Sequence, residues 1–389
     1  MRIIDIRETA IALETNMRNA VFDFSEMTTS VVAVITDVVR DGAPVVGYAF
    51  NSTGRYACGA AMRERFIPRV LRADPAALID PVRETIDPER VLACMQQREK
   101  PGGHAERSIA IGTIETAVWD ALAKIEGKPL HRVLADRYSV GVAPSRVFCY
   151  VGGGWYRPGG TIGDLQDEIR RHLDAGYTLV KIKVGGAPLA EDLQRIEAAI
   201  GVLGSGARLA VDANAKFDRD EALRYATALA PYGLRWFEEP CDPDDFELHA
   251  ELAAAYAPPL GAGENLYGVQ AVRNLVRLGG FRRDHDIIQV DPPQSYGLAS
   301  YARTMRMLEA EGWGRKSLFP HGGNQMSLAL VAGLGLGGCE AYPGVFGVFG
   351  GYADDARMDD GFLALSDRPG IGFEGHAKLH RVMRELAGV

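Results

Sequence analysis

The sequence has 389 residues, 47% of them hydrophobic and 24% charged, and its formal net charge is −8. This length exceeds one ordinary compact domain, but it accommodates an α/β barrel of roughly 250 residues together with a smaller second domain. The negative charge, without long basic runs, argues against a nucleic-acid partner. The longest apolar stretch, residues 327–338, is too short and too rich in glycine to cross a bilayer. We therefore expect neither a nucleic-acid partner nor a membrane partner.

The cysteines give information about the cellular compartment. Five are scattered along the chain, at positions 58, 94, 149, 241 and 339, and no CxxC pair occurs. This pattern predicts neither a disulfide framework nor a thiolate zinc site. The N-terminal residues alternate between apolar and polar types and lack the apolar core of an export signal. We expect a cytoplasmic protein.

The first third of the chain mixes strands with helices. Residues 30–36 (SVVAVIT) are rich in β-branched types, and residues 41–44 (DGAP) form a turn signal before a second strand. From about residue 61 to 135 the pattern becomes helical, as in IETAVWDALAKIEG, where apolar residues recur at helical spacing. We predict an α+β domain over residues 1–135, which the segment of about 365–389 completes.

Residues 136–364 show a different pattern, in which short apolar strands alternate with longer amphipathic helices. This alternation is typical of a parallel sheet whose strands are connected by helices. Eight βα units predict a catalytic (β/α)8-type barrel, a modified TIM barrel, so the fold class is α/β with a smaller N-terminal α+β domain. The expected strands are 147–151, 179–184, 209–212, 235–238, 260–264, 287–291, 317–321 and 339–342.

Charged residues stand at the ends of the expected strands and recur every 26 to 30 residues, the length of one βα unit. Asp212, Glu238 and Glu264 end three consecutive strands, whose ends meet at one mouth of the barrel. Three anions at close range need a cation between them, and oxygen ligands alone suit Mg²⁺, with Mn²⁺ as the substitute. Strand alternation turns Glu239 away from Glu238, so we expect Glu239 to support the ligands. The alternative is a network of salt bridges at the barrel end.

Two lysines and a histidine extend this set. Lys181 and Lys183 lie two residues apart on one strand and point into the barrel, where each is expected to lower the pKa of the other and so provide a general base. The alternative is a pair of surface lysines. Asp291 and His321 end neighbouring strands, so the carboxylate can orient the imidazole and stabilise its cation. Such a site suits removal of a proton next to a carboxylate, with a metal to stabilise the negative charge that develops.

In chain order, the motifs KIK, DAN, FEEP, GEN, QVD and PHGG resemble those of the mandelate racemase subgroup of the enolase superfamily. The similarity spans nearly the whole chain. It implies that the N-terminal domain is a capping domain, that the three carboxylates hold Mg²⁺, and that Lys183 is the base, with Lys181 beside it. A Lys or His base together with Mg²⁺ is a general property of this superfamily. The resemblance also implies an Asp291–His321 dyad, and places Glu340 near the substrate carboxylate.

Within the subgroup, PHGGNQMSLALVAGLGLGGCEAYPG and GGGWYRPGG are similar to acid-sugar dehydratases. The implied reaction converts D-tartrate to oxaloacetate and water: Lys183 removes the C2 proton, and protonated His321 assists loss of the 3-hydroxyl. A hydroxy-acid racemase or epimerase of the same superfamily is the nearest alternative, and a non-catalytic metal-binding barrel is another. The expected partner is a small hydroxy acid. We also expect a homo-oligomer, because barrels of this family are often symmetric assemblies.

Substrate specificity is expected to come from capping-domain loops that close over the mouth of the barrel. Lys100, in a glycine-flanked loop, is the preferred partner of a second substrate carboxylate. The other capping-domain candidates are Asn19, Asn51 and Arg55, and the ordinary polarity of surface loops explains all four residues equally well. Of the two aromatic residues after the first barrel strand, Trp155 and Tyr156, either can line the pocket or simply pack. The full set of candidate substrate contacts is Asn19, Asn51, Arg55, Lys100, Tyr156, Lys181 and Glu340.

Overall fold

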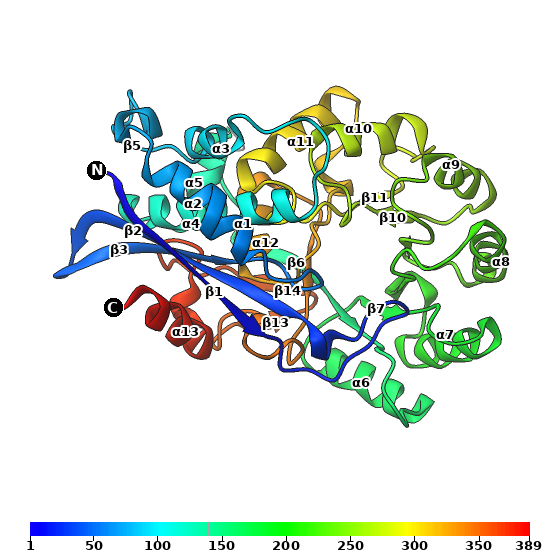
Figure 1. Cartoon of the computed structure of the whole chain (residues 1–389). Coiled ribbons are helices and arrows are strands. Elements are labelled where there is room, and N and C mark those ends of the chain that lie inside the picture. Colours follow the sequence, from blue (N-terminus) through cyan, green and yellow to red (C-terminus); the bar gives the residue numbers. More distant parts are fainter. Residues whose placement is uncertain (139–140) are drawn as a thin grey trace.

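The structure is a computed structural model that describes residues 1–138 and 141–389. An antiparallel sheet with its helices lies beside a larger barrel of strands and helices (Figure 1). The predicted fold, an α/β barrel with an N-terminal α+β domain, is confirmed.

The N-terminal part is built on one three-stranded antiparallel sheet. Its strands follow each other in the order β1, β2, β3, and a two-stranded ribbon of β4 and β5 lies apart from it. The strands are β1 (Ile3–Ala12), β2 (Thr28–Arg40), β3 (Ala43–Phe50), β4 (Ile79–Asp80) and β5 (Thr85–Ile86). The helices are α1 (Gly59–Ala61), which a π turn joins to α2 (Ile67–Leu71), then α3 (Pro88–Gln96), α4 (Glu106–Glu126) and α5 (Leu130–Arg137).

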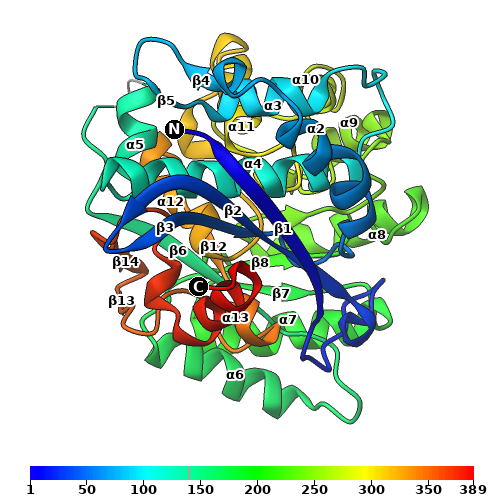
Figure 2. The same cartoon turned by 60° about the vertical axis from the view of Figure 1, so that its left-hand side comes forward.

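Helix α4 joins the N-terminal part to the barrel, and it is buried over nearly its whole length. It packs against β2 and β3 on one side and against α3 and α11 (Leu298–Ala310) on the other (Figure 2). The buried carboxylate of Glu115 accepts backbone N–H bonds from Leu298 at 2.8 Å and Ala299 at 2.9 Å, at the first residues of α11. A capping-domain side chain therefore satisfies free donors at the start of a barrel helix.

The barrel strands are parallel and neighbour one another in chain order from β6 to β11, and β12 pairs with β6. An α-helix follows each strand from β6 to β11, as the alternating pattern predicts. The strands are β6 (Arg146–Gly153), β7 (Val180–Lys183), β8 (Leu209–Asp212), β9 (Phe237–Glu238), β10 (Leu260–Ala262), β11 (Ile287–Ile288) and β12 (Cys339–Ala341). Besides α11, the barrel helices are α6 (Ile162–Asp174), α7 (Leu189–Leu203), α8 (Arg219–Leu229), α9 (Phe246–Ala255), α10 (Val269–Leu278) and α12 (Gln325–Leu334).

The prediction of a regular seventh strand over residues 317–321 is wrong. Leu318 makes an isolated parallel bridge to Ile288, and the backbone N–H of Phe319 donates to the carbonyl of Ile288 at 2.9 Å. Gly337, just before β12, donates to the carbonyl of Leu318 at 2.9 Å. Pro320 has no N–H, so it cannot extend this ladder. The segment therefore occupies the seventh position of the barrel with few hydrogen bonds.

The end of the chain returns to both parts of the molecule. The hairpin of β13 (Met358–Asp359) and β14 (Phe362–Ala364) adds to β6 in antiparallel fashion. Helix α13 (Ala377–Ala387) packs against β1 and β2 (Figure 2). The guanidinium of Arg7 donates to the carbonyl of Ala387 at 2.8 Å. The exact domain limits, residues 1–135, 136–364 and about 365–389, stay a prediction.

An aromatic layer fills the inside of the barrel below its mouth. Tyr150, Trp236 and Phe319 pack together there, and all three are buried. Charged side chains of the strand ends lie directly next to this layer, since Trp236 donates to Glu238 at 2.7 Å. All five cysteines are free and buried. No helix in residues 1–138 and 141–389 is long and apolar enough to span a membrane.

Candidate active site

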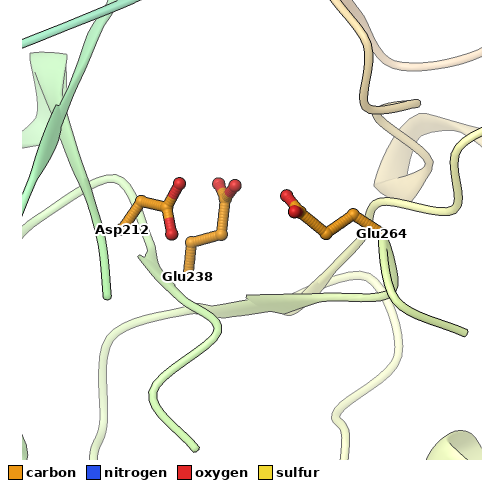
Figure 3. Close-up of side chains that lie close together, drawn as sticks. All are labelled: Asp212, Glu238 and Glu264. Carbon is orange, nitrogen blue, oxygen red and sulfur yellow. The ribbon is translucent and has the colours of Figure 1, made fainter. Parts of the chain in front are cut away.

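Three carboxylates converge at the mouth of the barrel. Asp212 is the last residue of β8, Glu238 is the last residue of β9, and Glu264 follows β10 by two residues. All three are buried, and one oxygen atom of each lies within 4.8 Å of those of the other two. Figure 3 shows the three carboxylates directed toward one common space. The three carboxylates predicted from the sequence spacing therefore form a group that can hold a metal ion.

Hydrogen bonds fix two of these carboxylates. The backbone N–H of Asn214 donates to Asp212 at 2.8 Å. The indole N–H of Trp236 and the amide of Gln289 both donate to Oε2 of Glu238, each at 2.7 Å. Sequence reasoning missed Trp236 and Gln289. Strand alternation gives a signal for Trp236, because it precedes Glu238 by two residues and so faces the same way.

Glu239 lies next to the three carboxylates but is not part of the group that can hold a metal ion. Its backbone has a positive φ of 41°, and its Oε1 accepts a hydrogen bond from the amide of Asn265 at 2.7 Å. Burial, together with the charges of Glu264 and Asp212, raises the pKa of Glu239 well above its usual range. Its role in supporting the ligands stays a prediction.

Both lysines of the KIK motif point into the barrel. Lys183 donates to Oδ2 of Asp212, while Lys181 donates to Oε1 of Glu238 and, at 2.6 Å, to Oε1 of Glu340. Burial lowers the pKa of Lys181, but Glu238 and Glu340 raise it well above its usual range. The prediction that the lysine pair lowers this pKa is therefore wrong for Lys181.

The two lysines consequently have different surroundings. Lys181 contacts two carboxylates closely and a third, Asp212, at 3.5 Å. Lys183 has Asp212 as its one charged partner among the described residues, and its ammonium lies 4.7 Å from the ring centroid of Trp155. Lys183 therefore makes fewer ionic contacts than Lys181, and its role as the base stays a prediction.

His321 and Asp291 form the predicted pair. Nδ1 of His321 lies 2.8 Å from Oδ2 of Asp291, which fixes the orientation of the imidazole. The other nitrogen, Nε2, lies 3.4 Å from Glu264 and 3.9 Å from Glu340. Burial lowers the pKa of His321, but Glu264, Asp291 and Glu340 together raise it to about 10. The structure therefore favours an imidazolium that is able to donate a proton.

Glu340 lies between Lys181 and His321. Its Oε1 also accepts a hydrogen bond from the hydroxyl of Tyr342 at 2.6 Å, and its Oε2 accepts one from the backbone of Gly322 at 3.3 Å. Burial raises its pKa, but Lys181 and His321 lower it below its usual range. Glu340 thus connects the two sides of the site, and its contact with substrate stays a prediction.

The charges of the site fit a divalent cation. Carboxylates outnumber cationic side chains by two, even when His321 carries a proton. A net charge of about −2 in a buried site is costly unless a counter-ion is present. An ion such as Mg²⁺ has this charge and prefers carboxylate oxygens. The carboxylates of the strand ends are Asp212, Glu238, Glu264, Asp291 and Glu340, and the cations are Lys181, Lys183 and His321.

A cavity of about 680 Å³ opens from Glu264 toward the capping domain, and Arg55 lines it. The guanidinium Nε of Arg55 donates to the hydroxyl of Tyr267 at 2.9 Å, and Tyr267 donates to Asn265 at 3.4 Å. Burial lowers the pKa of Arg55, but Tyr267 and Glu264 raise it. Sequence reasoning missed Tyr267, which shares a loop with the GEN motif. His104, also missed, lines the same cavity.

The other capping-domain candidates have mixed surroundings. The side-chain oxygen of Asn19 accepts backbone N–H bonds within its own turn, from residues 21 and 22. Asn51 accepts the N–H of Ser30 at 2.5 Å and donates to the carbonyl of Arg55 at 3.1 Å, so it holds the Arg55 loop. Lys100 is exposed on its loop. Direct substrate contacts by these residues stay predictions.

The structure separates the two aromatic residues after β6. Trp155 faces Lys183. The hydroxyl of Tyr156 instead donates to Asp192 at 2.6 Å, and its ring lies under the guanidinium of Arg195. The structure therefore does not bring Tyr156 to the three carboxylates, and of these two aromatic residues it is Trp155 that lies at the site.

Fold and site together define a class: an α/β barrel with an acidic metal-binding group, a lysine and a His–Asp pair at the strand ends. Residues 164–378 match the family model described as "Enolase C-terminal domain-like". This match covers more than half of the chain, which therefore belongs to the enolase superfamily.

Relatives with described activities include several acid-sugar enzymes. L-talarate/galactarate dehydratase of Salmonella typhimurium is 28% identical over 89% of this chain and 81% of its own length. Arabinonate dehydratase of Saccharolobus solfataricus is 29% identical over 69% of this chain and 70% of its own.

Solved structures show the same architecture. A racemase from Streptomyces coelicolor A3(2) with bound magnesium matches with a TM-score of 0.78 and 26% identity, over 97% of this chain and 99% of its own. The Salmonella typhimurium L-talarate/galactarate dehydratase, liganded with Mg and L-lyxarohydroxamate, matches with a TM-score of 0.76 and 25% identity, over 95% of this chain and 90% of its own.

Proposed function

We propose that this protein is a Mg²⁺-dependent acid-sugar dehydratase whose substrate is D-tartrate and whose products are oxaloacetate and water. The observation that carries the proposal is the placement of Lys183 and His321 around one acidic group. Lys183 contacts Asp212, and His321 lies 3.4 Å from Glu264. The dehydratases among its relatives support the reaction class. The choice of tartrate rests on the resemblance around PHGG and GGGWYRPGG.

Asp212, Glu238 and Glu264 would hold the Mg²⁺ ion, which supplies positive charge next to the substrate carboxylate and its 2-hydroxyl. Lys183, as the free amine, removes the proton from C2. His321, protonated and oriented by Asp291, gives a proton to the 3-hydroxyl, which leaves as water. The enol that results takes up a proton at C3 and becomes the 2-keto acid. Atoms balance, because tartrate minus water is oxaloacetate.

The test is a screen of mono- and diacid sugars with Mg²⁺, with 2-keto acid formation as the signal. General acid or base assistance is typically worth roughly 10²- to 10⁴-fold, so Lys183→Ala should lose at least about 100-fold in turnover. The exposed Lys378→Ala is the matched control and should match the wild type. Full turnover by Lys183→Ala would contradict the mechanism, and no turnover of any acid sugar by the wild type would favour the non-catalytic alternative. Activity on a six-carbon monoacid but not on D-tartrate would refute the substrate alone.

A racemase or epimerase is the second candidate, because a solved racemase shares the fold and because Lys183 and His321 are both able to exchange protons. Incubation in D₂O separates the two reactions. A racemase would incorporate deuterium at C2 while optical activity decays, and no keto acid would form. A dehydratase would consume the substrate and produce the keto acid.

A further inference from the structure

The loop between α3 and α4 carries Lys100 and borders the active-site cavity. Residues 100–104 of this loop are exposed. Gly103, His104 and Ala105 line the cavity that also contains Glu264. The ammonium group of Lys100 makes no ion pair or hydrogen bond with any residue that the structure describes. The position of Lys100 therefore depends on how the loop backbone is held.

One arginine holds that backbone. Nη1 of Arg107 donates to the carbonyl of Lys100 at 2.8 Å, and Nη2 donates to the carbonyl of Gly102. Its Nε donates to the hydroxyl of Tyr296 at 3.0 Å. Nδ1 of His104 lies 2.9 Å from the same hydroxyl. A planar guanidinium suits this task, because its donors point in fixed directions toward several acceptors.

Tyr296 connects the loop to the catalytic pair. It is buried, and its backbone has a positive φ of 67°. It follows the turn in which the N–H of Gln294 donates to the carboxylate of Asp291 at 3.0 Å and the N–H of Ser295 donates to the carbonyl of Asp291 at 2.9 Å. Through Arg107 and Tyr296, the Lys100 loop is thus hydrogen-bonded to the segment that fixes Asp291, the partner of His321.

The residue before Lys100 is anchored as well. The Glu99 carboxylate is 7% exposed and pairs with Arg65 at 2.6 Å, with Arg69 at 2.9 Å and with Arg107 at 3.6 Å. Hydrogen bonds between ionised guanidinium and carboxylate groups are stronger than those between neutral groups. The backbone on both sides of Lys100 is therefore fixed, while its side chain stays free to meet a ligand.

We propose that Arg107 is a positioning residue that sets the Lys100 loop at the mouth of the barrel, and so determines binding of the distal carboxylate of a diacid substrate. This inference rests on the proposed function, in which Lys100 meets a second carboxylate. Arg107 takes no part in proton transfer. Its loss should therefore weaken diacid binding and leave the chemical step largely intact.

The first test is steady-state kinetics of Arg107→Leu. Loss of hydrogen bonds made by a charged group should raise KM for the diacid roughly 10- to 100-fold, with kcat within about 3-fold of the wild type. KM for a monoacid sugar should change far less. Arg72→Leu is the matched control, because Arg72 is an exposed capping-domain arginine whose guanidinium makes no hydrogen bond or ion pair with a residue that the structure describes. A fall in kcat with unchanged KM, or equal losses for mono- and diacids, would overturn the proposal.

Two further measurements keep the test decisive. Tyr296→Phe removes the hydroxyl that Arg107 and His104 share, and should raise KM in the same direction but by less. Limited trypsin digestion reports the loop without any substrate: cleavage after exposed Arg98 should be faster in Arg107→Leu than in the wild type or in Arg72→Leu. Unchanged cleavage would overturn the positioning role. If the wild type converted no acid sugar, the proposed function would fail, and the cleavage rates would still decide whether Arg107 holds the loop.

Discussion

Mg²⁺ should stabilise the folded protein through the three carboxylates, and removal of one carboxylate should abolish this effect. The perturbation is Glu264→Gln, which keeps the size of the side chain but removes its charge. In the wild type, carboxylates exceed cations by two around the barrel mouth. The variant replaces one of the three carboxylate ligands with a neutral amide and removes half of this excess charge. It should therefore bind the ion much more weakly.

The expected size follows from linkage between binding and folding. An ion present at 100 times its dissociation constant adds about 2.7 kcal/mol to the free energy of unfolding. A chain of 389 residues gains about 0.8 kcal/mol per kelvin of unfolding entropy near its melting temperature. The ion should therefore raise the melting temperature of the wild type by about 3 °C.

The assay is thermal unfolding followed by circular dichroism, with EDTA or with a series of Mg²⁺ concentrations. Glu247→Gln is the matched control, because Glu247 is an exposed glutamate on a barrel helix. The control should show the wild-type shift, and Glu264→Gln should show almost none. A shift of wild-type size in Glu264→Gln would refute the assigned ligand set. No shift in the wild type at saturating Mg²⁺ would refute the metal site itself.

Two further predictions concern helix α4. Gly112→Ala should lower the melting temperature, although alanine normally stabilises a helix by about 1 kcal/mol relative to glycine. The reason is steric, because the added Cβ would lie 2.0 Å from the carbonyl oxygen of Pro293 and 2.6 Å from the backbone nitrogen of Gly297. A higher melting temperature of the variant would contradict this prediction. Burial raises the pKa of Glu115 from 4.5 to about 8, so the folded state keeps a proton that the unfolded chain releases, and stability should fall as pH rises across that range. Glu115→Gln has no such ionisable group. Its free energy of unfolding, relative to that of the wild type, should therefore rise by roughly 1.4 kcal/mol per pH unit between pH 5 and pH 8. A difference between the two proteins that does not change with pH would exclude the raised pKa of Glu115.

The barrel and its inner residues were predictable because repetition and alternation are local properties. Asp212, Glu238 and Glu264 follow from one βα spacing, and strand alternation turns both lysines of KIK inward. The pKa of Lys181 was not predictable in this way. Its dominant partners, Glu238 and Glu340, come from distant strands, and neither contact is visible in the two-residue spacing from Lys183. The prediction of a regular seventh strand was wrong because Pro320 interrupts this segment, which is hydrogen-bonded to the neighbouring strands at few positions.

The substrate contacts were harder to predict because alternation ends where a strand ends. Gly154 has a positive φ of 60°, which turns the chain directly after β6. Whether Trp155 or Tyr156 faces the site then depends on this turn and not on strand geometry. Capping-domain residues pose the same problem over longer distances. Arg55 lines the cavity, where the amide of Asn51 donates to its carbonyl and the hydroxyl of Tyr267, from the barrel, accepts a hydrogen bond from its guanidinium.

The charge of the site also bears on the class of substrate. A divalent ion offsets the two excess negative charges and leaves no positive charge inside the barrel for a dianion. One carboxylate of tartrate can lie beside the ion, but the other needs a cation from elsewhere. Lys100 is exposed, without an ionic partner among the described residues, on the loop that Arg107 holds at the cavity. A monoacid needs no such cation, so the discrimination between monoacids and diacids should lie in the capping domain, while the chemistry lies in the barrel.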